Sequence, residues 1–145
     1  MNKKVRKHIG QIGMITVIII LTGFVYLINV YGKDSKKEDS FMGYVSIDSK
    51  EAKYRIENET GYILVDVRRP DEYSNGHIPE AINIPNETIG TTSDIPELPK
   101  KDQRIYVYCR SGARSRQASG KLAAMGYTNI VEMGGVNTWP GNLVK

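Results

Sequence analysis

Cysteine is nearly absent from this chain, because Cys109 is the only one among its 145 residues. A single thiol excludes an intramolecular disulfide, so the hydrophobic core must hold the fold, and about 100 residues suffice for such a core. An excess of positive charge is also missing from most of the chain. The net charge of +4 arises within residues 1–39, which contain seven Lys/Arg and three Asp/Glu, whereas residues 40–145 contain thirteen of each. A folded part without a basic excess argues against a nucleic-acid-binding surface.

Charged residues are missing altogether from one long stretch, Ile9 to Gly32, in which Met14 to Val30 is dominated by Ile, Val, Leu and Phe. As a helix this stretch spans about 36 Å, which exceeds the hydrocarbon core of a bilayer at about 30 Å. The sequence therefore predicts a transmembrane anchor at residues 9–32, between a basic N-terminal segment (1–8) and a polar tether (33–43). A cleaved signal peptide is the alternative. The run is longer than the usual stretch of about 7–15 apolar residues in such peptides, and no convincing cleavage site follows it.

The orientation of this predicted anchor follows from the positive charges beside it. Residues 1–8 contain four Lys/Arg, whereas residues 33–39 contain three that are interspersed with acidic residues. Positive charge favours the cytoplasmic side of a membrane. We therefore expect a single-pass protein whose globular domain, residues 44–145, lies on the extracytoplasmic side.

The globular part alternates between strand-like and helix-like patterns. Tyr62–Val67 and Ile105–Tyr108 are apolar runs typical of buried strands in a parallel sheet, and Ala118, Leu122 and Met125 recur with helical spacing. This alternation predicts an α/β domain with a mostly parallel sheet. The other predicted elements are short strands over 44–47, 81–84 and 129–133, a helix from Asp48 to about Gly61, and a short helix or turn over 70–76.

Cys109 stands between a predicted strand and a predicted helix, at the start of a six-residue loop that ends at Arg114. Free backbone N–H groups and the positive end of the helix favour an anion there, so we expect the pKa of the thiol to fall below its usual value. Arg114 is expected to contact loop carbonyls or a substrate anion. Arg110 and Arg116 are either surface charges or groups that attract an anionic substrate. A buried structural thiol is the alternative to a nucleophile.

A series of motifs along residues 45–145 resembles a rhodanese domain. Several of its segments occur in the family's order: Leu64-Val65-Asp66-Val67-Arg68, Glu72-Tyr73, Gly76-His77-Ile78, Ala81-Ile82-Asn83-Ile84-Pro85, Cys109-Arg110-Ser111-Gly112-Ala113-Arg114-Ser115, Gly134-Gly135 and Trp139. The resemblance implies a three-layer α/β/α domain with a mostly parallel sheet. The chain departs from the family at Glu80, where glycine is common.

The resemblance implies a sulfurtransferase with Cys109 as the nucleophile. Its thiolate would take the outer sulfur of thiosulfate or a related small anionic donor, and the resulting persulfide would pass that sulfur to a thiol or protein acceptor. No metal or organic cofactor is needed. The expected substrate-binding residues are those of the loop and its helical end: Arg110, Ser111, Gly112, Ala113, Arg114 and Ser115.

Two other residues are expected to act at a distance from the substrate. Asp66 and Arg68 end the strand that lies beside the active loop in the family, and we expect them to brace that loop by hydrogen bonds. His77 precedes a turn in the family pattern, away from the thiol, so we expect a structural role and not a general base.

Two alternative functions remain at this point. A cysteine phosphatase also places a Cys and an Arg at a helix start, but it needs five residues between them; here four separate Cys109 from Arg114, and Ser115 stands at the five-residue spacing. The shorter loop favours one sulfur atom over a tetrahedral oxyanion. The second alternative, a membrane-anchored sulfur carrier or thiol-redox partner, keeps the same site, and the sequence does not separate it from a small-molecule enzyme.

Overall fold

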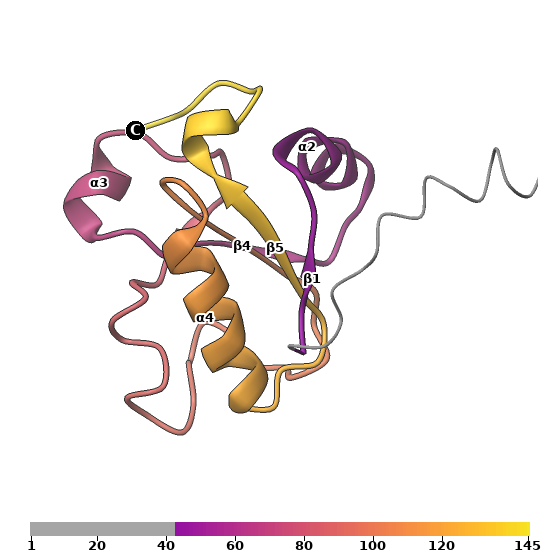
Figure 1. Cartoon of the computed structure of the whole chain (residues 1–145), viewed down its shortest axis with the longest axis vertical. Helices are drawn as coiled ribbons and strands as arrows, with labels where there is room; N and C mark the ends of the chain where they lie inside the picture. The colour runs from indigo at the N-terminus through magenta and orange to yellow at the C-terminus, as the bar shows by residue number, and fades with distance from the viewer. Residues whose placement is uncertain (1–42) are drawn as a thin grey trace, which may run out of the picture. The chain divides into compact units, whose positions relative to one another are not determined.

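The computed structural model describes residues 43–145, which contain a five-stranded parallel sheet flanked by helices (Figure 1). The strand order is β1-β5-β4-β2-β3, and every neighbouring pair is parallel. In chain order the elements are β1 (Val45–Ser46), α2 (Ser49–Asn58), β2 (Ile63–Asp66), α3 (Pro70–Ser74), β3 (Ile82–Asn83), β4 (Ile105–Cys109), α4 (Ala113–Ala124), β5 (Ile130–Gly135) and the 3-10 turn η3 (Val136–Thr138).

Two hydrophobic clusters cover the two faces of the sheet. Val107 and Cys109 of β4 pack with Leu122 of α4, whereas Tyr106 of β4 packs with Ala52 of α2. Successive side chains of a strand point to opposite faces, so the alternation along β4 separates the clusters. Figure 1 shows α4 and α2 on opposite sides of β5. The predicted α/β fold with a parallel sheet between helical layers is confirmed.

Helix boundaries differ from the prediction by a few residues. Asp48 caps α2 as expected, with its carboxylate accepting from the backbone N–H groups of Lys50 and Glu51. The helix ends at Asn58, three residues before its predicted end near Gly61, and Gly61, at φ +76°, lies in the turn before β2. Helix α4 starts at Ala113, before Arg114, the predicted end of the loop.

Strand β5 runs two residues farther than its predicted end at Met133. Gly134 and Gly135 therefore belong to the strand instead of following it. Gly135 pairs in register with Cys109 across an irregularity between Val107 and Cys109 in β4. Whether a glycine pairs as part of a strand depends on the residue opposite it on the neighbouring strand. The pattern of a single sequence does not identify that residue.

Glu80 is the only non-glycine residue with a positive φ between residues 43 and 145, at φ +66°. This is the left-handed region, which costs a residue with a Cβ about 1 kcal/mol or more. Glycine, which is common at this position in the family, would adopt this conformation without that cost, so Glu80 strains the backbone of a turn.

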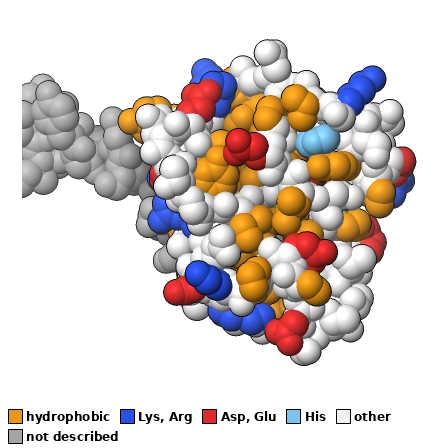
Figure 2. Space-filling view, turned by 180° about the vertical axis from the view of Figure 1, so that it is seen from behind, with side chains coloured by type: hydrophobic (Ala, Val, Ile, Leu, Met, Phe, Trp, Pro, Cys, Tyr) orange, Lys and Arg blue, Asp and Glu red, His pale blue; other side chains and the backbone are white. Residues whose placement is uncertain are grey.

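The predicted anchor at residues 9–32, the basic segment before it and most of the tether lie outside the described residues. Within residues 43–145 no helix is both long and apolar enough to cross a bilayer. The described surface carries charges of both signs, and Figure 2 shows them interspersed among apolar side chains on one face.

Candidate active site

Cys109 is the last residue of β4, at the carboxyl end of a central strand, where ligands of parallel sheets commonly bind. The chain then turns back toward its sulfur before α4 begins. The backbone N–H of Gly112 donates to the sulfur at 3.1 Å, and the nearby backbone groups of Ser111 and Ser115 also lower the pKa of the thiol. The loop therefore forms a ring of amide donors around one sulfur atom.

This ring of donors decides the acidity of the thiol. Burial by itself raises the pKa of Cys109, but hydrogen bonds from the backbone and hydroxyl of Ser115 and from the backbones of Ser111 and Gly112 outweigh it. The net effect is a pKa below the ordinary value, as the sequence predicted. The thiolate, the reactive form of the side chain, is favoured at this position.

Two glycines allow the ring to close. Gly112 adopts φ +99°, a left-handed conformation that directs its N–H to the sulfur. Gly135 lies directly against the loop, and a Cβ there would stand 2.3 Å from the carbonyl oxygen of Arg110. A side chain at Gly135 would therefore displace the loop. The Gly-Gly pair of the sequence motif thus has a structural role at the site.

The sulfur lies beneath the loop and not on its surface. Cys109 is 1% exposed, whereas Arg110, Ser111 and Ala113 of the loop are exposed. The backbone N–H of Gly112 points inward, to the sulfur itself.

Of the two contacts expected for Arg114, loop carbonyls or a substrate anion, the structure contradicts the first. Its guanidinium instead makes two bonds to the Glu72 carboxylate, at 2.6 and 2.8 Å. Hydrogen bonding from Arg114 is the largest effect on Glu72 and lowers the pKa of that carboxyl to about 2. The pair ties the start of α4 to α3, a connection between residues 42 positions apart that sequence spacing does not predict.

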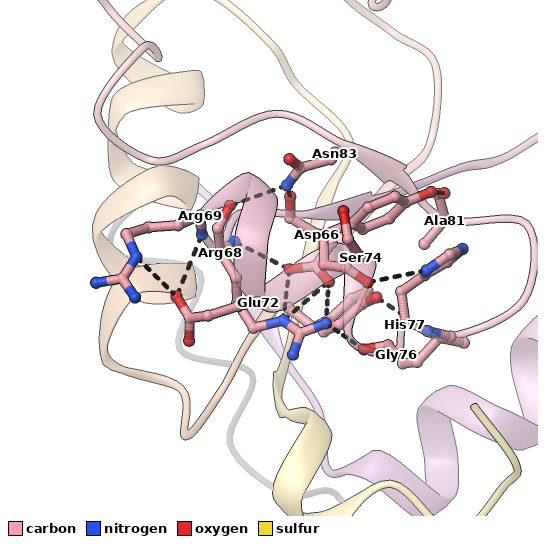
Figure 3. A network of polar contacts seen from close by, with 12 residues as sticks. Asp66, Arg68, Arg69, Glu72, Ser74, Gly76, His77, Ala81 and Asn83 are labelled. Atoms are coloured by element: carbon pink, nitrogen blue, oxygen red, sulfur yellow. Dashed lines mark hydrogen bonds and ion pairs between the residues drawn. The ribbon is translucent and has the colours of Figure 1, made fainter. Parts of the chain in front are cut away.

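Asp66 and Arg68 form a closed ion pair on the other face of the sheet (Figure 3). Arg68 donates to both Asp66 oxygens at 2.6 to 3.0 Å and to the carbonyl of Gly76 at 2.7 Å. Both residues are buried, at 0% and 6% exposure. In the described part of the chain neither side chain bonds to residues 110–115. The hydrogen bonds that we expected to hold the cysteine loop therefore hold the segment between β2 and β3, at Gly76.

His77 has the structural role that was predicted. Its ring stacks on Tyr73 with the ring centroids 3.8 Å apart, and its Nδ1 bonds to the Tyr73 carbonyl. Its backbone pairs with Val144 near the C-terminus. Figure 3 shows it beside Gly76, within the network around Asp66 and not at the cysteine loop.

Sequence reasoning missed one residue beneath the site, Glu132 of β5. Its carboxylate is buried and accepts from the Ser115 hydroxyl at 2.5 Å, from the backbone N–H of Gly134 at 2.9 Å and from the Ser46 hydroxyl at 3.1 Å. A carboxylate within the apolar run Ile130–Met133 was the available signal. Within residues 43–145 no cluster of three or more His, Cys, Asp or Glu side chains could hold a metal ion.

Comparisons with known proteins agree with this geometry. Residues 48–141 match the family model described as a rhodanese-like domain. A sulfurtransferase of Allochromatium vinosum is 39% identical over 95 residues, which cover 64% of this chain and 85% of the relative. The thiosulfate sulfurtransferase PspE of Escherichia coli is 40% identical over 76 residues, 50% of this chain and 68% of the relative. A rhodanese-like domain protein from Staphylococcus aureus has a similar solved structure, with a TM-score of 0.58 and 32% identity over 69% of this chain and 97% of that one.

Proposed function

The chain belongs to the rhodanese-like domain family, and on that premise we propose that it transfers a sulfane sulfur from thiosulfate or a related anionic donor to a thiol acceptor through a persulfide on Cys109. The observation that carries the proposal is the ring of backbone donors closed on the Cys109 sulfur, with Gly112 at 3.1 Å. Relatives that are named as sulfurtransferases support it.

The first half of the reaction loads the cysteine. The Cys109 thiolate attacks the outer sulfur of thiosulfate, a new S–S bond forms, and the old S–S bond breaks as sulfite leaves with its electron pair. The outer sulfur of the persulfide then carries the negative charge. Preorganised amide donors stabilise such a charge without having to reorganise, so the ring around Cys109 suits this intermediate.

The second half returns the cysteine to its starting state. An acceptor thiolate attacks the outer sulfur of the persulfide, and Cys109 leaves as the thiolate. The same donors that favour the thiolate in the free protein, those of Ser111, Gly112 and Ser115, stabilise it as a leaving group. Both half-reactions thus use one set of backbone groups.

The position of Arg114 supports sulfur transfer over phosphoryl chemistry. A phosphatase needs its arginine to face the anion in the loop, but the Arg114 guanidinium bonds twice to Glu72. The donor to the sulfur is instead the backbone N–H of Gly112, which is directed at a single sulfur atom. This arrangement suits a persulfide better than a tetrahedral phosphate.

We further propose, from the sequence, that residues 9–32 anchor the protein in a membrane with the domain on the extracytoplasmic side. The uncharged run and the basic N-terminal segment support this topology. Protease added to spheroplasts should digest the domain of the full-length protein. Digestion only after lysis would place the domain inside the cell and contradict the proposed orientation.

The central experiment uses the single thiol of the chain. Incubation with thiosulfate should raise the intact mass by about 32 Da, the mass of one sulfur atom held covalently. Addition of cyanide or a thiol should reverse the increase. The Cys109→Ser variant should fold normally but gain no mass and transfer no sulfur. Undiminished turnover in this variant, or an unchanged mass of the wild type beside an active control enzyme, would refute the proposal.

A further inference from the structure

Three arginines follow Cys109 closely in the chain, and the structure gives them different surroundings. The guanidinium of Arg114 makes two bonds to the carboxylate of Glu72, which balances its charge. Arg110 and Arg116 are exposed, and neither side chain makes a hydrogen bond or an ion pair with any residue that the structure describes. In the described part of the chain, two cations close to the nucleophile therefore have no counter-charge.

The guanidinium of Arg116 lies against the cysteine loop at Gly112. A Cβ on Gly112 would stand 2.9 Å from Nη1 of Arg116 and 3.7 Å from its Cζ. The same glycine donates its backbone N–H to the sulfur of Cys109 at 3.1 Å. With standard bond lengths, these contacts put Nη1 at most about 9 Å from the sulfur. A small anion can therefore touch this guanidinium while its other end is near the nucleophile.

The missing side chain at position 112 makes room for this cation. Arg116 is four positions further along, and its backbone N–H bonds to the carbonyl of Gly112 at 3.2 Å. Side chains of a helix lean back toward its N-terminus, which directs the Arg116 side chain over the preceding turn. Any side chain at position 112 would compete with the guanidinium for the same space. Glycine thus serves both the turn of the loop and the contact with Arg116.

An arginine without a counter-charge is available to an anion. Its planar guanidinium carries five N–H donors in a fork that fits two oxygens of an oxyanion at once. The sulfonate end of thiosulfate carries such oxygens, whereas the outer sulfur is the atom that is transferred. A hydrogen bond between charged groups changes binding by about tenfold or more.

We propose that Arg116 binds the anionic end of the sulfur donor and makes the site select anionic donors over uncharged ones. The proposal rests on the sulfur transfer proposed above for the identity of the donor, but its first test needs no sulfur transfer. During loading the S–S bond of the donor breaks and sulfite leaves with the electron pair. Arg116 holds this leaving group, stays protonated and forms no covalent bond.

The other two arginines are placed differently with respect to a donor. An anion at Arg114 would have to compete with the carboxylate of Glu72, which already occupies two N–H groups. The same pairing neutralises Glu72, so this carboxylate repels an anion at Arg116 only weakly. Arg110 is unpaired as well, and it is compared with Arg116 in the experiment below.

The test compares two alkylating reagents of similar shape, anionic iodoacetate and uncharged iodoacetamide. The chain has one cysteine, so every adduct in the intact mass of the full-length protein reports Cys109. Arg116→Gln should lower the ratio of the iodoacetate rate to the iodoacetamide rate by about fivefold, because only the anionic reagent loses an ionic contact. Arg116→Lys keeps the charge and should keep most of the ratio.

Two further variants locate the effect. Lys100→Gln removes an exposed cation at the opposite edge of the sheet, five positions before β4 begins, and should leave the ratio unaltered. Arg110→Gln should lower the ratio less than Arg116→Gln. A ratio that does not respond to Arg116→Gln, a larger fall in Arg110→Gln, or a thiol that reacts with neither reagent would overturn the proposal. Arg116 is exposed, so we expect its variants to fold like the wild type.

A second measurement uses turnover with thiosulfate and cyanide. Arg116→Gln should raise the KM for thiosulfate by about tenfold and change kcat less, because a binding contact is lost. An unaltered KM in an active variant would overturn the assignment. If the wild type transfers no sulfur but its reagent ratio depends on Arg116, the anion site stands and the proposed sulfurtransferase activity fails. The two failures are therefore distinguished.

Discussion

The ends of two neighbouring strands, β2 and β4, use buried polar groups in opposite ways. At the end of β2 the Asp66 carboxylate is occupied by Arg68, and at the end of β4 the Cys109 sulfur is surrounded by amide groups. The two strands pair in register, but these side chains lie on opposite faces of the sheet. A carboxylate that is already neutralised by a buried cation contributes to stability. A sulfur surrounded by fixed hydrogen-bond donors is suited to carry a negative charge during a reaction. The following substitutions test whether the Asp66–Arg68 pair serves mainly stability and the surroundings of Cys109 mainly activity.

Arg68→Ala should have the largest effect, and on stability. It leaves the Asp66 carboxylate buried without its cation, and breaking such a pair costs about 3–5 kcal/mol. Urea unfolding of the wild type and variant measures this loss. Protein that remains folded should keep most of its sulfur transfer.

Arg69→Ala is the matched control for Arg68→Ala. Arg69 bonds to Asp71 at 2.9 Å, but this pair is exposed to solvent, so the stability should barely change. Equal stability losses in the two variants would mean that burial of the Asp66 pair is not what matters.

Gly135→Ala should have the reverse pattern to Arg68→Ala, because it should reduce activity more than stability. Its Cβ would stand 2.3 Å from the Arg110 carbonyl oxygen and push the loop away from the sulfur. Loss of aligned donors lowers rates by about 100-fold or more. The pH at which Cys109 becomes reactive toward an alkylating reagent should also rise. Gly120→Ala, on α4 with open space around it, is the control and should stabilise the helix slightly. Full activity of Gly135→Ala would contradict the proposed role of the close approach.

The Glu72–Arg114 pair should make the free energy of unfolding fall as the pH decreases. The pKa of Glu72 is about 2 in the folded protein against an ordinary 4.5, so the stabilisation is complete above pH 4.5 and disappears as the pH falls toward 2. After allowance for partial solvent exposure we expect about 1–2 kcal/mol from this pair.

Unfolding of wild type and Glu72→Gln from pH 6 to pH 2.5 measures this contribution, and the two should converge at the acid end. A double-mutant cycle with Arg114→Gln isolates the pair from other effects. A constant difference across the pH range would contradict the assignment.

Glu80→Gly should have the smallest effect, a gain of stability. The substitution relieves the positive φ of a residue with a Cβ, and the greater freedom of glycine in the unfolded chain offsets part of the gain. We expect about 0.5–1 kcal/mol in thermal or urea unfolding. Glu80→Ala keeps the unfavourable conformation and should not stabilise the protein. A gain in the alanine variant equal to that of glycine would point to the charge instead of the backbone.

The fold and the position of the nucleophile were predictable because both depend on local patterns. Apolar runs and helical spacing identified the central strands and α4, and Cys109 stood at the junction that joins them. The lowered pKa of its thiol followed from the same junction. The predicted pairings of charged side chains were less successful, since Arg114 bonds to Glu72 and Asp66 to Arg68, away from the loop.

The sequence by itself determined the α/β order and the single thiol at the end of a strand, because both depend on residues close together in the chain. Only the tertiary structure decided that Gly135 lies against Arg110 and that Glu132 meets Ser115 beneath the sulfur. These contacts join β5 to the loop and helix that follow β4. Their geometry depends on the register between two strands and on the packing of a helix over them, which no local pattern encodes.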